Sequence, residues 1–489
     1  MNVYLIVIIC YLVLMVGISV YKSFSIKDQK DFMVSNRNVS TFLLITTLIA
    51  TWTGAGSLIG GAGLAYRQGF SELWMAVGGW IGIIVTYWFA AKVRHISQYT
   101  LPDILEKRYN GFAKLLGSIA IIIAFTTIVG YQLKGGAFVL ELTTGIPWQT
   151  GVAIMAIMVI ILPALAGMKS IVSLDLLNGI LIIVAILIAV PLLLIDLGGP
   201  AAVMEALPKE HFSLLGGHNI VWGLAVFLPV FLLLVGEPSM YQKFSSAVSE
   251  KAARRSVIGW IIGIIVVDIF IVTLAILGRV KFPQLGAEGH AERIILDVAR
   301  YGLPTWAGCL LLAASMAIVF STANSLLMTP ATNATHDIIQ RFIVKDMKPK
   351  TVVIVNRIMI AVLGGMAYLL LTQFKNVLTM SITAYTMIGA GITPAILAAF
   401  FWKRVTTAGG VAGILGGIVG TIATKLLLDM QSVQSYFEAN FGIPAAELGE
   451  YIIIPAFGIA ALLLIVVSLL GKPDPVEKWQ IFFEKPKRR

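Results

Sequence analysis

Thirteen apolar runs, each about as long as a membrane-spanning helix, follow one another along this chain of 489 residues. A helix needs roughly 20 apolar residues to cross a bilayer, and in lipid only helices and closed barrels satisfy their own backbone hydrogen bonds. With 58% of residues apolar and 12% charged, the chain has too few charges to be a set of soluble domains. The pattern predicts an all-α integral membrane protein with about 13 transmembrane helices, at approximately residues 3–21, 40–66, 73–92, 115–141, 150–167, 171–195, 220–243, 256–278, 306–334, 352–373, 377–401, 407–428 and 451–470.

The distribution of basic residues predicts the orientation. If the N-terminus is outside, 26 of the 36 lysines and arginines lie in inner segments and 8 in outer segments, as the positive-inside rule requires. We therefore expect a multi-pass protein of the plasma membrane with its N-terminus outside and its C-terminus in the cytoplasm. Because the surplus of positive charge belongs to the inner face of the lipid bilayer, no nucleic-acid partner is expected. We expect the chain to function as a monomer.

Two of the apolar runs contain residues that break helices. The second run has five glycines, with Gly54 the first of them, and the seventh contains Pro229 and the sequence Gly236-Glu237-Pro238. Proline removes a backbone hydrogen bond, and freed backbone groups are tolerated in a membrane only beside a cavity or an ion. Gly54, Pro229, Gly236 and Pro238 are thus the predicted helix breaks. The alternative is that these residues only allow close packing of helices.

The two broken helices lie five spans apart, and an odd offset inverts orientation. Two inverted repeats of five helices, each led by a discontinuous helix, are typical of secondary transporters. The expected divisions are residues 1–39 (an extra span and a cytoplasmic loop), 40–219 (first repeat), 220–405 (second repeat) and 406–489 (two further spans and a cytoplasmic tail).

The ninth run supplies neutral oxygen atoms. Ser321 and Ser325 are four residues apart, on one face of a helix, and Thr322 adjoins them. Neutral oxygens suit a hard monovalent cation that must be released in each cycle. The alternative is that these hydroxyls bond to their own helix or to its neighbours.

Chemistry other than transport has little support in the sequence. The two cysteines lie inside apolar runs and the five histidines form no ligand-spaced pair, so we expect neither a cofactor nor an enzyme. Asp175, Asp268 and Lys134 are three of the charged residues within the predicted spans. Asp175 is either an ion ligand or a partner of Lys169 at the interface; Asp268 is expected to be structural. Lys134 is expected to snorkel or to form a structural pair, the alternative being that it binds a substrate carboxylate or replaces a cation.

Four separated motifs resemble the sodium:solute symporter family, which includes transporters of proline, pantothenate, glucose, sialic acid and choline. They are A-T-W-T-G-A-G from Ala50, A-G-M-K-S-I-V-S-L-D ending at Asp175, G-E-P-S-M-Y-Q-K-F from Gly236 and I-V-F-S-T-A-N-S from Ile318. The resemblance implies a LeuT-type fold and sodium as the coupling ion. It implies a sodium site formed by the carbonyls of Ala50, Thr53 and Ile318 with the side chains of Ser321 and Thr322. A second sodium site, present in some members, would use Asp175, Asn324 and Ser325.

The same resemblance places the solute beside the two breaks. The residues expected to line its site are Trp52, Thr53, Gly56, Tyr131, Gln132, Phe227, Phe231 and Tyr385. The segment around Trp52 is similar to the choline transporters, whereas the segments after Ser57 and around Tyr131 are similar to the pantothenate and monocarboxylate branch, so the charge of the solute stays open. We expect sodium-coupled symport of a small organic solute by alternating access. A proton-coupled or sodium-independent carrier or channel is the alternative, with Asp175 or Lys134 as the relay.

Overall fold

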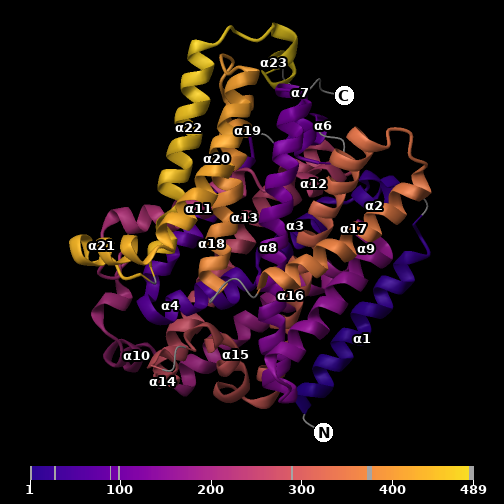
Figure 1. Cartoon of the computed structure of the whole chain (residues 1–489). Coiled ribbons are helices and arrows are strands. Elements are labelled where there is room, and N and C mark those ends of the chain that lie inside the picture. The colour runs from indigo at the N-terminus through magenta and orange to yellow at the C-terminus, as the bar shows by residue number, and fades with distance from the viewer. Residues whose placement is uncertain are drawn as a thin grey trace.

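Apolar helices make up most of the chain, as seen in the computed structural model (Figure 1). The structure describes residues 3–26, 29–88, 90–96, 100–287, 290–371, 377–445 and 447–483. The first part contains α1 (Val3–Ser23), α2 (Gln29–Val34), α3 (Thr41–Trp52), η2 (Gly56–Gly61), α4 (Ala62–Gln68), η3 (Gly69–Glu72), α5 (Leu73–Thr86), α6 (Ala90–Ile96), α7 (Pro102–Arg108), α8 (Gly111–Thr144), α9 (Trp148–Asp196) and α10 (Pro200–Ala206). The second part contains α11 (Ile220–Val235), α12 (Pro238–Ser246), α13 (Glu250–Lys281), α14 (Gln284–Ala287), α15 (Ile294–Asp297), α16 (Thr305–Thr332), η7 (Asn333–Ile343), α17 (Pro349–Leu370), α18 (Val377–Gly391), α19 (Thr393–Phe401), α20 (Thr407–Leu428), α21 (Gln431–Phe441), η9 (Leu448–Ile452), α22 (Ile453–Leu470) and α23 (Val476–Phe483).

Twelve helical segments in the described part of the chain are long and apolar enough to cross a membrane, against about 13 predicted. The difference arises at the second and third predicted spans. There α3 has only 12 residues before the chain unwinds, and Gly56–Thr86 follows as one long apolar segment. Within α9, Gly167 has a φ of 52°, a conformation that favours glycine, and it separates the fifth and sixth predicted spans. The start of α1 lies at one end of the bundle and α23 at the other in Figure 1.

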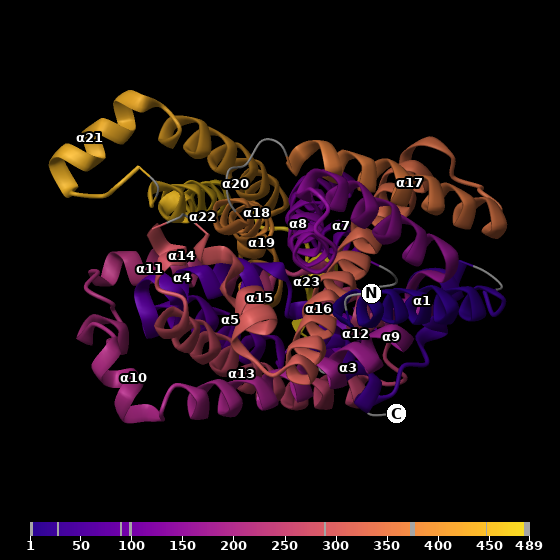
Figure 2. The same ribbon diagram turned by 90° about the horizontal axis from the view of Figure 1, so that it is seen from below.

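The two halves of the chain pack against each other reciprocally. Helix α5 of the first half packs on the broken helix α11 of the second, and α13 of the second half packs on α3 and α4 of the first. At the centre, α8 contacts α16, and both contact α9. The helices α20 and α22 run side by side at the periphery, with α21 next to them (Figure 2). This arrangement brings the two broken helices together in the middle of the protein.

Candidate sodium and solute site

The first break leaves three backbone carbonyl oxygens facing α16. Helix α3 ends at Trp52, and Thr53 has an extended ψ of 106° before the chain coils again at Gly56. The hydroxyl of Thr322, on α16, donates to this end: its Oγ1 lies 2.8 Å from the carbonyl oxygen of Thr53, 3.1 Å from that of Thr51 and 3.4 Å from that of Ala50. Ile318 is buried on α16, one turn before Thr322, and residues four apart share a helix face. Backbone and hydroxyl oxygens thus converge where α3 meets α16.

The backbone freed by the first break is held by α8. The amide of Ala55 donates to Oε1 of Gln132 over 2.8 Å. A Cβ atom on Gly54 would lie 2.6 Å from Nε2 of Gln132 and 3.0 Å from Cγ2 of Thr322. Glycine is therefore required here by the close approach of α8 and α16.

The second break is capped by a carboxylate. Helix α11 ends at Val235, and Oε2 of Glu237 accepts the amide of Met240 over 2.7 Å at the start of α12. Pro238 is the first residue of α12. Pro229, predicted as a break, is wrong in that role: it lies inside α11, which continues for six residues beyond it. A single proline bends a helix without ending it when neighbouring helices support the backbone.

Asp175 lies at the centre of a buried polar network beside the first break. It accepts hydrogen bonds from the hydroxyls of Ser321 and Thr47, and Nζ of Lys243 lies 3.2 Å from its Oδ2. Both Asp175 and Lys243 are 1% exposed. The predicted alternative, a pair between Asp175 and Lys169, is wrong, because Lys169 instead pairs with Asp31 over 2.9 Å.

Lys243 has four oxygen atoms around its ammonium group. Besides Asp175, Nζ donates to the carbonyl oxygen of Thr47 over 2.9 Å, to its hydroxyl over 2.7 Å, and to the hydroxyl of Thr51. The Thr51 hydroxyl also lies 3.0 Å from that of Ser325. The ammonium therefore shares Asp175 with the second sodium site that the resemblance implies, and Ser325 of that site lies one hydrogen bond further, at Thr51. Asn324, the third residue of that predicted site, is buried, and its Oδ1 accepts no hydrogen bond from the described residues.

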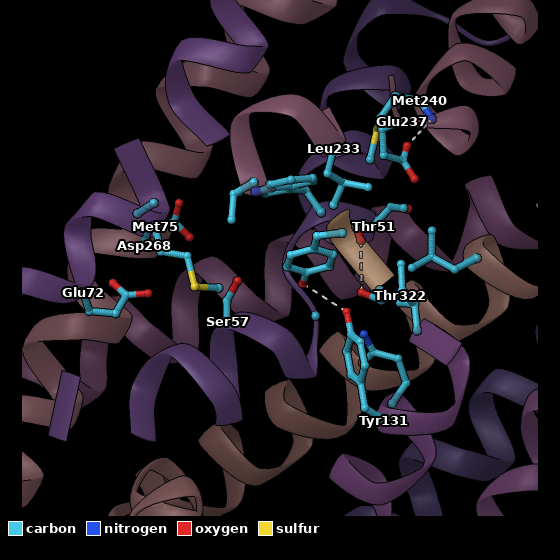
Figure 3. Close-up of a pocket in the computed structure, with 18 residues that line it drawn as sticks. Thr51, Ser57, Glu72, Met75, Tyr131, Leu233, Glu237, Met240, Asp268 and Thr322 are labelled. Atoms are coloured by element: carbon cyan, nitrogen blue, oxygen red, sulfur yellow. Dashed lines mark hydrogen bonds between the residues drawn. The ribbon is translucent and has the colours of Figure 1, made fainter. Parts of the chain in front are cut away.

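A narrow pocket lies between the two breaks (Figure 3). Of the predicted solute residues, Trp52, Tyr131, Gln132 and Tyr385 line it. The hydroxyls of Tyr131 and Tyr385 are 3.0 Å apart. Its free volume is about 50 Å³, whereas a vestibule bordered by α4, α8 and α18 encloses about 830 Å³. The pocket can admit a solute only if its walls move.

Other sequence-predicted residues lie around the pocket without lining it. Phe227 and Phe231 stack on each other with ring centroids 5.6 Å apart, and Phe227 contacts Trp74 of α5. Lys134 lines the vestibule, half-buried, with Nζ 5.7 Å from the Phe138 ring centroid.

Four charged residues near the breaks were not assigned to the site from the sequence. Glu72, Glu237 and Asp268 line the pocket, and Lys243 contacts Asp175. Asp268 was expected to be only structural. Each of the four lies inside or at the edge of an apolar run, and a charge in such a position is the sequence feature that could have identified it as functional.

A close contact at Gly56 gives a first prediction. A Cβ atom there would lie 2.4 Å from the Tyr385 hydroxyl oxygen, so Gly56→Ala should overpack the pocket wall and lower the free energy of unfolding by about 1–3 kcal/mol. Gly365, on the helix α17, has nothing within 4 Å of such a Cβ, so Gly365→Ala should leave the melting temperature unchanged or raised. Thermal unfolding of the two purified variants measures the difference; equal melting would contradict the close contact.

Comparisons with known proteins identify the family and the fold. The model of the sodium:solute symporter family matches residues 32–417. The chain belongs to the sodium:solute symporter family. Its relatives include the sodium/proline symporter of Escherichia coli, 26% identical with 94% of this chain and 91% of the relative covered, and the sodium/pantothenate symporter of the same organism, 27% identical with 86% and 90% covered.

Solved structures show the fold of this family member. A sodium-coupled sialic acid symporter in a substrate-bound, outward-open state matches with a TM-score of 0.77 at 16% identity, covering 96% of this chain and 98% of that one. Mhp1, a nucleobase-cation-symport-1 family transporter, matches in a closed conformation with a TM-score of 0.62 at 12% identity, covering 91% and 95%. The predicted fold class is confirmed: the chain is an all-helical, multi-pass membrane protein with the LeuT-type transporter fold. Family membership implies sodium as the coupling ion.

Proposed function

We propose that this chain carries a small organic solute into the cell together with sodium by alternating access. The supporting observation is the convergence of the Thr322 hydroxyl on the carbonyl oxygens of Ala50, Thr51 and Thr53. A sodium ion bound by these oxygens, with Ile318 and Ser321 beside them, would join α3 to α16 and complete the wall of the solute pocket. Each ion that enters is driven by about 2.3 kcal/mol per 100 mV of membrane potential.

The solute and the orientation belong to the same proposal. Proline and pantothenate symporters among the relatives support a small organic solute. Low sodium and negative potential inside the cell favour release there. The excess of lysine and arginine in the inner segments supports an N-terminus outside and a cytoplasmic C-terminus. Trp52, Tyr131, Gln132 and Tyr385 would form the wall of the solute pocket.

We expect one sodium ion per transport cycle. A second ion at Asp175, Asn324 and Ser325 would have to share Asp175 with the Lys243 ammonium, 3.2 Å away. Two cations around one buried carboxylate repel each other strongly at low dielectric constant. Lys243 therefore takes the electrostatic place of a second ion.

Melting of the purified protein tests sodium binding directly. NaCl should raise the melting temperature above that in equimolar KCl, with a midpoint that reports the sodium affinity. Proteoliposomes with an inward sodium gradient should then accumulate solute. Equal melting in both salts, together with uptake driven by a pH gradient alone, would contradict sodium coupling and favour a proton-coupled carrier.

A further inference from the structure

The pocket between the breaks is lined by acids without a balancing base. Glu72, Glu237 and Asp268 line it, whereas lysine, arginine and histidine are absent from the described residues that do so. A carboxylate buried in a membrane protein without a partner is costly. An acid that lacks donors from the protein is therefore a candidate to bind a ligand.

Glu237 is already satisfied by its own helix. Its carboxylate accepts the amide of Met240 over 2.7 Å and the hydroxyl of Ser239 over 2.8–2.9 Å. These donors belong to the N-terminus of α12, where a carboxylate is favoured. Glu237 therefore acts as a helix cap.

Glu72 has no such support. It ends η3 at the entrance to α5, is 5% exposed, and its Oε2 is buried with no hydrogen-bond donor among the described residues. Its other oxygen, Oε1, packs against Gly61 so closely that a Cβ atom there would lie 2.7 Å away. The carboxylate is thus held in place by packing and keeps an unused acceptor.

Asp268 lies with Glu72 at one end of the pocket. It is on α13, 6% exposed, and its Oδ2 accepts the indole N–H of Trp80 over 2.9 Å. Figure 3 shows Glu72, Asp268, Met75 and Ser57 on the same side of the close-up, away from Glu237. Two buried acids thus lie at this end of the pocket, and the indole of Trp80 donates to Asp268.

We propose that Glu72 and Asp268 bind the positively charged nitrogen of the transported solute, which is a protonated primary or secondary amine. This inference rests on the proposed symport function and names its substrate class. The acceptor on Glu72 that the described residues leave unused is available to a ligand donor, which an N–H ammonium supplies and a quaternary ammonium does not. A solute whose only charge is a carboxylate would be repelled by both acids.

The class of ligand is tested by thermal unfolding of the full-length protein in NaCl and in KCl. The probes are pyrrolidine, N,N-dimethylpyrrolidinium and cyclopentanecarboxylate, which share one ring, followed by a panel of amino acids, amines, carboxylates and sugars that includes L-proline and pantothenate. Compounds that raise the melting temperature in sodium should all carry an N–H ammonium. Stabilisation only by carboxylates, sugars or quaternary amines, or by no amine at all, would overturn the proposal.

Variants then place the nitrogen at the acids. Glu72→Gln and Asp268→Asn should each weaken the sodium-dependent stabilisation by the best amine at least tenfold and leave the sodium midpoint without amine unchanged. Glu450→Gln is the matched control, since Glu450 is also a buried acid that accepts an indole N–H, from Trp222 over 2.7 Å, but borders the vestibule. It should keep the response to the amine.

The outcomes separate the possible cations. If Glu72→Gln shifts the sodium midpoint and leaves the amine response intact, the acids bind an inorganic cation and the proposal is wrong. If sodium fails to stabilise the unaltered protein while amines still do, the proposed symport function fails and the amine site stands. Melting of each variant without ligand identifies any that is merely unfolded, in which case Glu72→Asp, which keeps the charge, should restore both the fold and part of the amine response.

Discussion

Thr322→Val should lower the apparent sodium affinity by about 10–100-fold. The substitution keeps the shape of the side chain and removes the hydroxyl that faces the carbonyl oxygens of Thr53, Thr51 and Ala50. Loss of one oxygen next to a cation corresponds to roughly 1.5–3 kcal/mol. The sodium midpoint of thermal stabilisation, and of uptake once a solute is known, measures the change.

Two companion variants separate this effect from general damage to α16. Thr322→Ser keeps the oxygen and should stay within a few-fold of the unaltered protein. Ser315→Ala removes a buried hydroxyl on the same helix that donates to the carbonyl oxygen of Leu311 over 2.8 Å, and should leave the sodium midpoint where it was. An unchanged midpoint in Thr322→Val would remove Thr322 from the sodium site.

The hydroxyl of Ser321 donates to Asp175. A double variant therefore removes both hydroxyls that join α16 to the sodium site and to Asp175. Ser321→Ala together with Thr322→Ala should abolish sodium-dependent uptake while the protein remains folded. Undiminished uptake by the double variant would contradict the proposed site as a whole.

The fold and the first break could be predicted because their causes are local. The length of an apolar run determines whether it can span the membrane. Gly54 and Gly236-Glu237-Pro238 interrupt the helix through their own backbone preferences, which do not depend on the neighbouring helices. The span count differed by one because α3 has only 12 residues before the break at Thr53. The number of glycines in a run does not predict at which residue the helix ends.

The partners of the buried charges could not be predicted, since they depend on how distant helices pack. Asp175, on α9, and Lys243, on α12, are 68 residues apart and meet because both helices pack against α3. The sequence instead favoured Lys169, which is close in the chain. Glu72 was overlooked since it lies between two apolar runs, although packing buries it. Phe227 and Phe231 were placed by the resemblance, which puts the solute beside the second break, whereas their helix face is determined by the contact of α11 with α5.

The largest effect on stability is expected at the buried pair of Lys243 and Asp175. Lys243→Met should lower the free energy of unfolding by about 3–5 kcal/mol, because it leaves the charge of Asp175 buried without its cation. Asp175→Asn should cost a similar amount, and the double variant should cost less than the sum of the two, as coupled partners do. Lys281 and Asp196 form an exposed pair over 2.5 Å, with side chains 33% and 48% exposed, so Lys281→Met should change stability by less than about 1 kcal/mol.

The same pair predicts the sodium dependence of transport. With the Lys243 ammonium among the oxygens of Asp175, Thr47 and Thr51, sodium activation of the unaltered protein should be hyperbolic, with a Hill coefficient near one. Lys243→Ala, purified in sodium, vacates that position and leaves a buried carboxylate that a second sodium ion can neutralise. Its Hill coefficient should rise above one, and its melting temperature should depend more steeply on sodium than that of the unaltered protein. A Hill coefficient near two before any substitution would show instead that two ions bind while Lys243 is in place.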